Sequence, residues 1–133
     1  MHDRCIILSS SQKRHKYTSG KKCRMKKGGE PIMIKAGIIG ATGYAGNELA
    51  RLLLGHKETE VVWYGSRSYI DKEYAGIYQN FFKLVDAKCM DDNMEALADE
   101  VDVIFTATPQ GLCASFVNEG ILSRAKVIDL SAD

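Results

Sequence analysis

The sequence IKAGIIGATGYAGNEL, residues 34–49, changes from an apolar run to a glycine-rich loop and then to a helical pattern. Residues 34–39 are rich in Ile, which is typical of a strand buried on both faces of a parallel sheet. Gly40, Gly43 and Gly46 follow at a spacing of three. We expect Gly40 and Gly43 to let backbone N–H groups approach a pyrophosphate, with a positive φ at Gly43. Gly46 is expected to let a helix pack closely on the strand.

The flanking sequence favours a dinucleotide site over an ordinary glycine-rich turn. The G-x-x-G-x-x-G spacing differs from the usual G-x-G-x-x-G, so the loop by itself leaves both interpretations open. Leu49, Leu52 and Leu53 recur at the spacing of a buried helix face, and Gly55 supplies a stop. Residues 60–65 then predict a second strand by their β-branched and aromatic content. An anion fits at the start of the predicted helix, where N–H groups have no intrahelical partner.

The residues after the second strand indicate which dinucleotide binds. NAD-specific sites place a carboxylate about 20 residues beyond the glycines, where it binds the ribose 2′-hydroxyl. Here Ser66, Arg67 and Ser68 occupy that position. A guanidinium and two hydroxyls suit the 2′-phosphate of NADP. A solvated turn that carries an arginine is the alternative.

The rest of the chain continues the alternation of strands and helices. The patterns predict strands at residues 84–90, 101–107 and 126–130, and helices at residues 93–99 and 110–122. The aromatic residues between 74 and 82 are expected in the core. Thr108 and Pro109 follow a buried strand at its carboxyl end, where ligands of open α/β sheets bind. The sequence therefore predicts an α/β fold, a doubly wound parallel sheet of the Rossmann type.

Charge divides the 133 residues into a leader and a domain. Residues 1–32 hold nine Lys and Arg against two acidic residues, whereas residues 33–133 hold nine against fifteen. The leader has only scattered apolar residues, so we expect it to be disordered. Residues 33–133 are expected to form one NADP-binding domain, and no apolar stretch is long enough to cross a membrane.

Several interpretations of the leader compete. A nucleic-acid or membrane-binding arm fits the charge but has no other support in the chain. A transit peptide would be basic too, but this leader is lysine-heavy and lacks an amphipathic period, and residues 5–8 are too short for a secretory signal core. We favour a non-native leader. Residues 26–30 can be encoded by a purine-only run resembling a ribosome-binding site, which would make Met33 the true start.

The four cysteines are Cys5, Cys23, Cys89 and Cys113. They form no C-x-x-C pair and no Cys/His cluster at metal-ligand spacing, so we expect neither a metal site nor a disulfide framework, and a reducing cytoplasm fits best. Cys113 lies near a predicted helix start, where a thiol's pKa can be lowered. Burial on a helix face with Phe116 and Val117 is the interpretation we favour.

Three motifs resemble the N-acetyl-γ-glutamyl-phosphate reductase family of semialdehyde dehydrogenases. Residues 40–49, GATGYAGNEL, are similar to that family's opening, residues 66–68 to its 2′-phosphate site, and residues 128–133, IDLSAD, to the run after a later strand. The family often has histidine where Gln110 stands. The aspartate-semialdehyde dehydrogenases share the glycine loop but usually lack a tyrosine at the position of Tyr44.

The resemblance implies NADPH-dependent reduction of an acyl phosphate to a semialdehyde through a cysteine thiolate, in arginine biosynthesis. It covers residues 33–133, and the family's nucleophilic cysteine, general-acid histidine and substrate domain lie later in its sequence. The chain is therefore expected to be inactive alone, with no catalytic residue. An acyl phosphate substrate and a homo-oligomer are expected of the complete enzyme, without nucleic acid or membrane. The candidate cofactor-binding residues are Gly40, Thr42, Gly43, Tyr44, Ala45, Gly46, Ser66, Arg67, Ser68, Thr108 and Pro109.

Two alternatives remain open on the sequence alone. Within the same class of enzyme, the chain resembles the aspartate-semialdehyde dehydrogenases less closely. From another class, a non-catalytic NADP-binding module or redox sensor would account for the missing nucleophile.

Overall fold

The computed structural model describes residues 5–7, 28 and 32–131. Its strands are β1 (Cys5–Ile7), β2 (Ile34–Ile39), β3 (Thr59–Gly65), β4 (Cys89–Met90), β5 (Val103–Thr106) and β6 (Lys126–Asp129). Its α-helices are α1 (Tyr44–Leu54), α2 (Tyr74–Ile77), α3 (Met94–Glu100), α4 (Leu112–Phe116) and α5 (Glu119–Arg124), and a 3₁₀ turn, η1, spans Gln79–Phe81.

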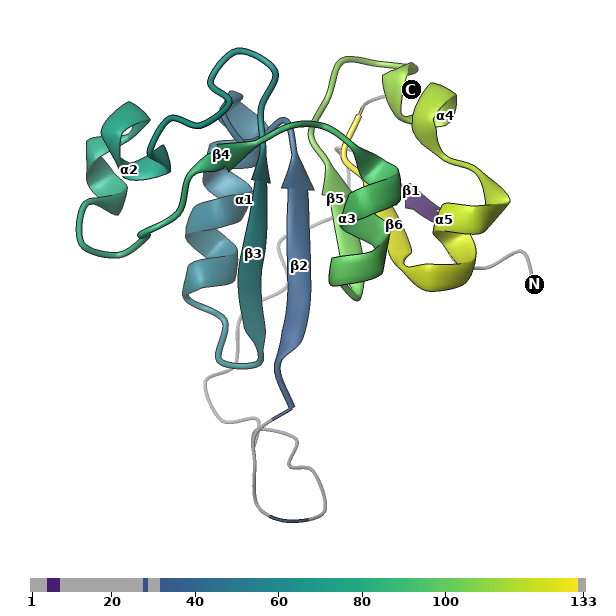
Figure 1. The fold of residues 1–133 in the computed structure, drawn as a ribbon, viewed down its shortest axis with the longest axis horizontal. Coiled ribbons are helices and arrows are strands. Elements are labelled where there is room, and N and C mark those ends of the chain that lie inside the picture. The colour runs from purple at the N-terminus through teal and green to yellow at the C-terminus, as the bar shows by residue number, and fades with distance from the viewer. Residues whose placement is uncertain (1–4, 8–27, 29–31, 132–133) are drawn as a thin grey trace.

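All six strands form one parallel sheet in the order β1-β6-β5-β2-β3-β4 (Figure 1). From β2 the chain moves outward through β3 to β4, and then returns to the other side of β2 for β5 and β6. Strand order therefore reverses between β2 and β5, which is the switch point of a doubly wound sheet. The predicted fold class is confirmed.

β1 belongs to the basic leader, for which we expected no ordered structure. That expectation does not hold for Cys5–Ile7, which pairs in parallel with β6 from Cys5 opposite Val127 to Ile7 opposite Asp129. The exposed backbone groups along the edge of β6 are what a short additional strand can bind. Of the other leader residues only Gly28 and Ile32 are described, so the predicted origin of the leader lies outside the described residues and stays a prediction.

Helices cover both faces of the sheet, as Figure 1 shows with α1 behind it and α3 in front. Successive residues of a strand point to opposite faces. Ile38 accordingly joins a core with Ala50 of α1, while Ile39 joins a core with Leu97 of α3. Both Ile residues are fully buried. This explains why β2 is apolar at consecutive positions instead of alternating.

Two of the predicted elements were wrong in extent. The helix expected over residues 110–122 is broken into α4 and α5, because Val117 is extended (φ −80°, ψ 128°) and the Asn118 side chain caps α5 by accepting a bond from Ile121 N at 2.9 Å. The strand expected over residues 84–90 is reduced to β4. Leu52 was also misplaced, since its side chain is exposed and α1 buries Gly46 and Ala50 instead.

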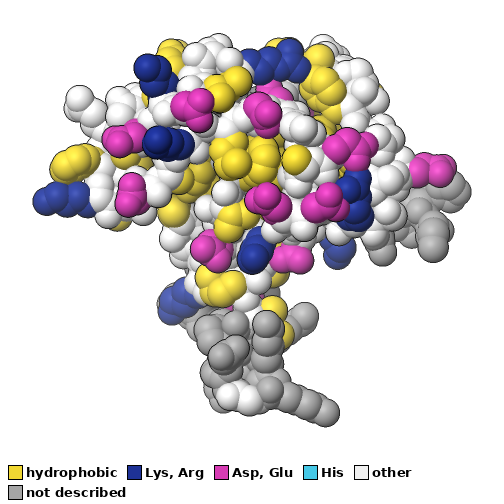
Figure 2. Space-filling model, viewed as in Figure 1, with side chains coloured by type: hydrophobic (Ala, Val, Ile, Leu, Met, Phe, Trp, Pro, Cys, Tyr) yellow, Lys and Arg dark blue, Asp and Glu magenta, His cyan; other side chains and the backbone are white. Residues whose placement is uncertain are grey.

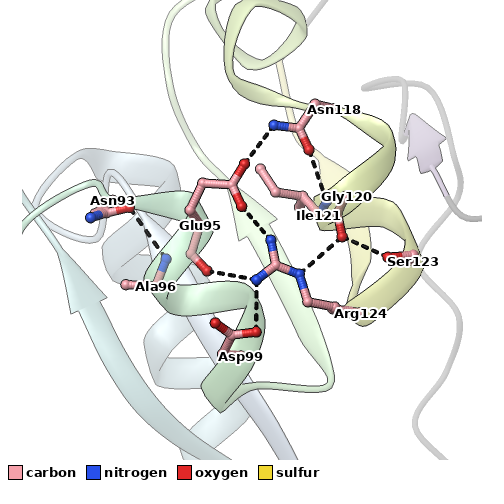
Figure 3. A network of polar contacts seen from close by, with 9 residues as sticks. All are labelled: Asn93, Glu95, Ala96, Asp99, Asn118, Gly120, Ile121, Ser123 and Arg124. Carbon is pink, nitrogen blue, oxygen red and sulfur yellow. Dashed lines mark hydrogen bonds and ion pairs between the residues drawn. The ribbon is translucent and has the colours of Figure 1, made fainter.

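A polar network on the surface joins α3 to α5 (Figure 3). Arg124 Nη1 donates to Asp99 Oδ1 at 2.7 Å, and its Nη2 pairs with Glu95. Asn118 Nδ2 also donates to Glu95, at 2.6 Å. These groups are exposed, so the network adds little to stability. The buried core beneath contributes most of the packing between the two helices. On the face drawn in Figure 2, acidic and basic side chains are interspersed around apolar ones.

Among the described residues, none of the helices has both the length and the apolar character that a bilayer span requires.

The start of α1 lies against the end of β2 with no side chain between them. A Cβ added at Gly46 would stand 2.1 Å from Gly40 O and 2.8 Å from Ala41 Cα. Both are backbone atoms, which cannot turn aside as the end of a side chain can. The predicted role of Gly46 in close helix–strand packing is therefore consistent with the structure.

Gly46→Ala should lower the free energy of unfolding by about 1–3 kcal/mol or more, because the helix must shift to admit the methyl group. Urea denaturation of the purified chain measures this. Gly76→Ala in α2 is the matched control, because its Cβ would meet only Glu73 Cβ at 3.7 Å. An equal effect of the two changes would contradict the packing argument.

Candidate functional site

The loops after β2 and β5 meet at the carboxyl edge of the sheet, on the two sides of the switch point. Gly40 has φ +77°, and a Cβ there would stand 2.5 Å from Ala107 O. Only glycine fits this conformation and this approach without strain. Ligands of open α/β sheets bind in the crevice between such loops.

The start of α1 lies at this edge of the sheet without a side-chain cap. Gly43 is the N-cap, and within the described part of the chain no side-chain hydrogen bond caps the helix. Such N–H groups and the helix dipole bind anions. Tyr44 and Ala45, the first residues of the helix, are both exposed there. The chain therefore leaves room for a phosphate beside them.

Gly43 differs from its two neighbours in the motif. Its φ is −83°, so the positive φ expected there was wrong, and the left-handed residue is Gly40. A Cβ at Gly43 would lie 3.4 Å from Gly40 O and 4.0 Å from Ala107 O, which is ordinary contact. The fold itself does not require glycine at this position. Gly43 is exposed, so a side chain there would stand at the surface beside the loops after β2 and β5.

Two tyrosine hydroxyls donate hydrogen bonds to backbone carbonyls of the glycine loop. Tyr74 Oη donates to Ala41 O at 2.8 Å, and Tyr78 Oη donates to Thr42 O at 2.7 Å. Tyr74 is fully buried, with its ring centroid 4.5 Å from that of Tyr64. Burial raises the pKa of Tyr64 to about 12 and that of Tyr74 further, so both keep their protons.

Sequence reasoning placed these two tyrosines in the core but did not find their contacts with the loop. It also placed Phe82 in the core, which was wrong, because Phe82 is 68% exposed. The spacing of the tyrosines at 74 and 78 indicated a shared helix face, and no local signal indicated which backbone carbonyls the hydroxyls bind.

The segment after β3 lies beside the glycine loop. Ser66 is buried, and its Oγ is 2.9 Å from Thr42 Oγ1, so these two candidate residues are brought together. Ser68 is exposed. The Arg67 side chain is 59% exposed, and its Nε donates to Asp92 Oδ2 at 2.9 Å. Sequence reasoning did not single out Asp92, since an exposed loop after a two-residue strand carries no periodic signal.

Thr108 and Pro109 border the crevice from the side of β5. Thr108 Oγ1 is buried and has no hydrogen-bond partner among the residues that the structure describes. Buried polar atoms without partners are rare in native proteins, so this hydroxyl suits contact with a bound molecule. Pro109 is exposed, and its carbonyl accepts from Leu112 N at 3.2 Å to start α4.

A buried carboxylate supports the loop after β5 from the next strand. Asp129 Oδ1 accepts from Thr106 Oγ1 at 2.8 Å and from Ser131 N at 3.0 Å, while Oδ2 accepts from Ser131 Oγ at 2.7 Å. Burial alone would raise the pKa of Asp129, but these bonds and one from Cys113 outweigh it and lower the pKa. The aspartate is thus charged and satisfied by neutral donors.

The expected burial of Cys113 is confirmed, since it is 3% exposed. Cys89 is buried as well, and burial raises the pKa of its thiol. Within the described ranges, no three or more His, Cys, Asp or Glu side chains gather where they could hold a metal ion.

These features together define a dinucleotide-binding domain of the Rossmann type: a parallel sheet with a switch point, a glycine loop opening a helix, and polar groups after the second strand. The orphaned Thr108 hydroxyl and the uncapped, exposed start of α1 fit a bound dinucleotide. Residues 35–133 match the model of the semialdehyde dehydrogenase NAD-binding domain, and the chain belongs to that family.

Curated relatives are N-acetyl-gamma-glutamyl-phosphate reductases. Over 101 residues the chain is 79% identical to that of Lachnospira eligens, 68% to that of Lachnoclostridium phytofermentans and 45% to that of Heliobacterium modesticaldum. The matches cover 76% of this chain and 29% of each relative. The chain thus spans less than a third of the length of these relatives.

A solved structure shares the fold. The aspartate semialdehyde dehydrogenase of Candida albicans, crystallised with NADP, superposes with a TM-score of 0.58 at 23% sequence identity. The match covers 73% of this chain and 29% of that one.

Gly43→Val should abolish dinucleotide binding while lowering the free energy of unfolding by less than about 1 kcal/mol, because a branched side chain fills the crevice but adopts φ −83° readily. Fluorescence titration with NADPH and with NADH measures binding, and urea denaturation measures stability. Gly43→Ala should give a smaller loss of binding. Unchanged titrations for the valine variant would mean that the glycines only form a turn.

Proposed function

We propose that this chain is the N-terminal, NADP-binding part of an NADPH-dependent N-acetyl-γ-glutamyl-phosphate reductase. The observation that carries the proposal is 79% identity over 101 residues to a relative of that name. The reaction would reduce an acyl phosphate to a semialdehyde, with inorganic phosphate released. A cytoplasmic location, an acyl phosphate substrate and a homo-oligomer are proposed for the complete enzyme, with no nucleic acid or membrane partner.

The preference for NADP over NAD rests on the segment after β3. No carboxylate follows that strand directly, so the 2′-hydroxyl of NAD would lack its usual acceptor there. The Arg67 guanidinium uses Nε for Asp92, and its two terminal nitrogens have no partner among the described residues. Two terminal N–H groups in one plane suit two oxygens of a phosphate. Ser66 and Ser68 precede and follow Arg67 in the sequence.

The other candidate residues divide between the parts of the cofactor. Gly40, Gly43 and the N–H groups of Tyr44, Ala45 and Gly46 would hold the pyrophosphate, with Thr42 beside them. Thr108 and Pro109 would border the cofactor on the side of β5. When bound, the nicotinamide supplies the hydride.

The chain is proposed to be inactive by itself. The proposed reaction needs a cysteine thiolate that attacks the acyl phosphate, and attack needs the thiolate close to the carbonyl carbon. Cys89 and Cys113, the cysteines whose side chains the structure describes, are buried in the core. The catalytic groups would come from the sequence that the longer relatives have beyond this match.

Arg67→Ala should weaken NADPH binding about 10- to 150-fold, or about 1.5–3 kcal/mol, and leave NADH binding nearly unchanged, because only NADPH carries the 2′-phosphate. Equilibrium titration with each cofactor measures the difference. Arg51→Ala is the matched control, since Arg51 is exposed on α1 and pairs with Glu48. Equal losses for the two cofactors would refute the assignment of Arg67.

The 133-residue chain should show no NADPH oxidation with N-acetyl-γ-glutamyl phosphate, and no NADP reduction with the semialdehyde and phosphate. Absorbance at the NADPH band follows both directions, and NADPH titration confirms that the sample binds cofactor. Turnover lost on Cys113→Ser would make Cys113 the nucleophile. Turnover retained by that variant would assign the chemistry to another group of this chain, and either result would contradict the proposed inactivity.

A further inference from the structure

Asp92 lies beside Arg67 at the carboxyl edge of the sheet, in the loop that follows β4. The Asp92 side chain is 12% exposed, whereas that of Arg67 is 59% exposed. Asp92 Oδ2 accepts from Arg67 Nε at 2.9 Å. The carboxylate is thus mostly buried, while the guanidinium that it binds through Nε stays largely exposed.

Burying this carboxylate costs folding free energy, and hydrogen bonds offset that cost only in part. Asp92 Oδ1 is buried and has no partner among the described residues. Burial raises the pKa of Asp92, and the bond from Arg67 opposes that effect. A partly unsatisfied buried carboxylate weakens the folded state, so fold stability alone does not account for it.

The neighbouring strand end makes room for this carboxylate. A Cβ added at Gly65 would stand 2.9 Å from Asp92 Oδ1 and 3.0 Å from Ile38 O. Any other residue at the end of β3 would therefore press on the carboxylate and on the backbone of β2. The glycine directly before Ser66 and Arg67 fits an arrangement in which Asp92 reaches the guanidinium.

A second contact acts on Arg67 from α4. The guanidinium carbon lies 5.3 Å from the centroid of the Phe116 ring, within the range of a cation–π contact. Asp92 holds one edge of the guanidinium through Nε, and Phe116 lies across it. Together these contacts restrict a side chain that has several freely rotating bonds, and they leave both terminal nitrogens available.

We propose that Asp92 is a positioning residue for cofactor selection: it holds Arg67 by Nε so that the two terminal nitrogens face the 2′-phosphate of NADP. This inference rests on the proposed NADP-binding function. Preorganisation contributes to affinity because the ordering of the arginine is complete before the ligand arrives. The carboxylate does not itself touch the phosphate.

The test is equilibrium titration of the whole chain with NADPH and NADH for Asp92→Asn and Asp92→Ala. Asparagine keeps a neutral acceptor for Nε, and alanine removes it. We expect NADPH binding to weaken about 3-fold with asparagine and about 10-fold with alanine, with NADH binding changed less than about 2-fold. Asp91→Asn is the matched control, because it removes the same charge one residue away and keeps an acceptor for Asn93 N.

A double variant separates positioning from a general effect on the fold. In an Arg67→Ala background, Asp92→Ala should cost no further NADPH affinity, since the residue it positions is gone. Equal losses for NADPH and NADH in the single variant, or a further loss in the double variant, would overturn the inference. Tighter NADPH binding by Asp92→Asn would overturn it too, by showing that the carboxylate competes with the phosphate.

The outcome for Arg67→Ala alone distinguishes the two levels of proposal. If that change does not select between the cofactors, the proposed function of Arg67 fails. If it does select while Asp92→Ala has no effect, only the role of Asp92 fails.

Discussion

The contact between the glycine loop and the start of α1 determines where every other part of the site lies. Gly46 sits against Gly40 O and Ala41 Cα so closely that no side chain fits between them. This contact directs the N-terminus of α1 at the end of β2. Gly40 in turn approaches Ala107 O, so the loop after β5 takes its place from the loop after β2. The positions of these two loops thus depend on close backbone packing.

A buried carboxylate, Asp129, and a half-buried one, Asp92, lie at the same edge of the sheet and have different roles. Asp129 accepts hydrogen bonds at both oxygens from neutral donors, and its pKa is lowered. It ties β6 to β5 and so supports the loop that carries Thr108. Asp92 is satisfied at one oxygen only, and its pKa is raised. The first arrangement stabilises the fold, whereas the second leaves a group oriented toward Arg67.

The fold of this domain tolerates wide variation in sequence. The Candida albicans structure has the same fold at 23% identity. A doubly wound sheet asks mainly for apolar strands, helices on both faces and small residues at close contacts. Gly37 is such a residue in the central strand, since a Cβ there would lie 2.4 Å from Leu97 Cδ1 of α3. The side chains that read a ligand are free to vary on this frame.

Local patterns were enough to predict β2, α1, β3, α3 and the doubly wound class of the sheet, because each element shows its own period and its own stop signal. The same patterns placed Arg67 after β3 and the glycines at the start of α1. Predicted element boundaries were wrong where the backbone of a single residue interrupted a periodic pattern. Val117 is an example, because its extended backbone ends α4. The burial predicted for Leu52 was wrong, because helical spacing predicts which residues share a face but not whether another element covers that face.

Contacts between distant segments were decided only by the tertiary structure. The bonds from Tyr74 and Tyr78 to the glycine loop join residues 33 and 36 positions apart, and that from Arg67 to Asp92 joins residues 25 apart. Contacts between residues so far apart produce no periodic pattern in the sequence. The sequence by itself thus determined the class of the sheet and the glycine loop. Which side chains hold that loop and that arginine in place depended on how the strands align in the sheet, since parallel strands bring their carboxyl ends to one edge.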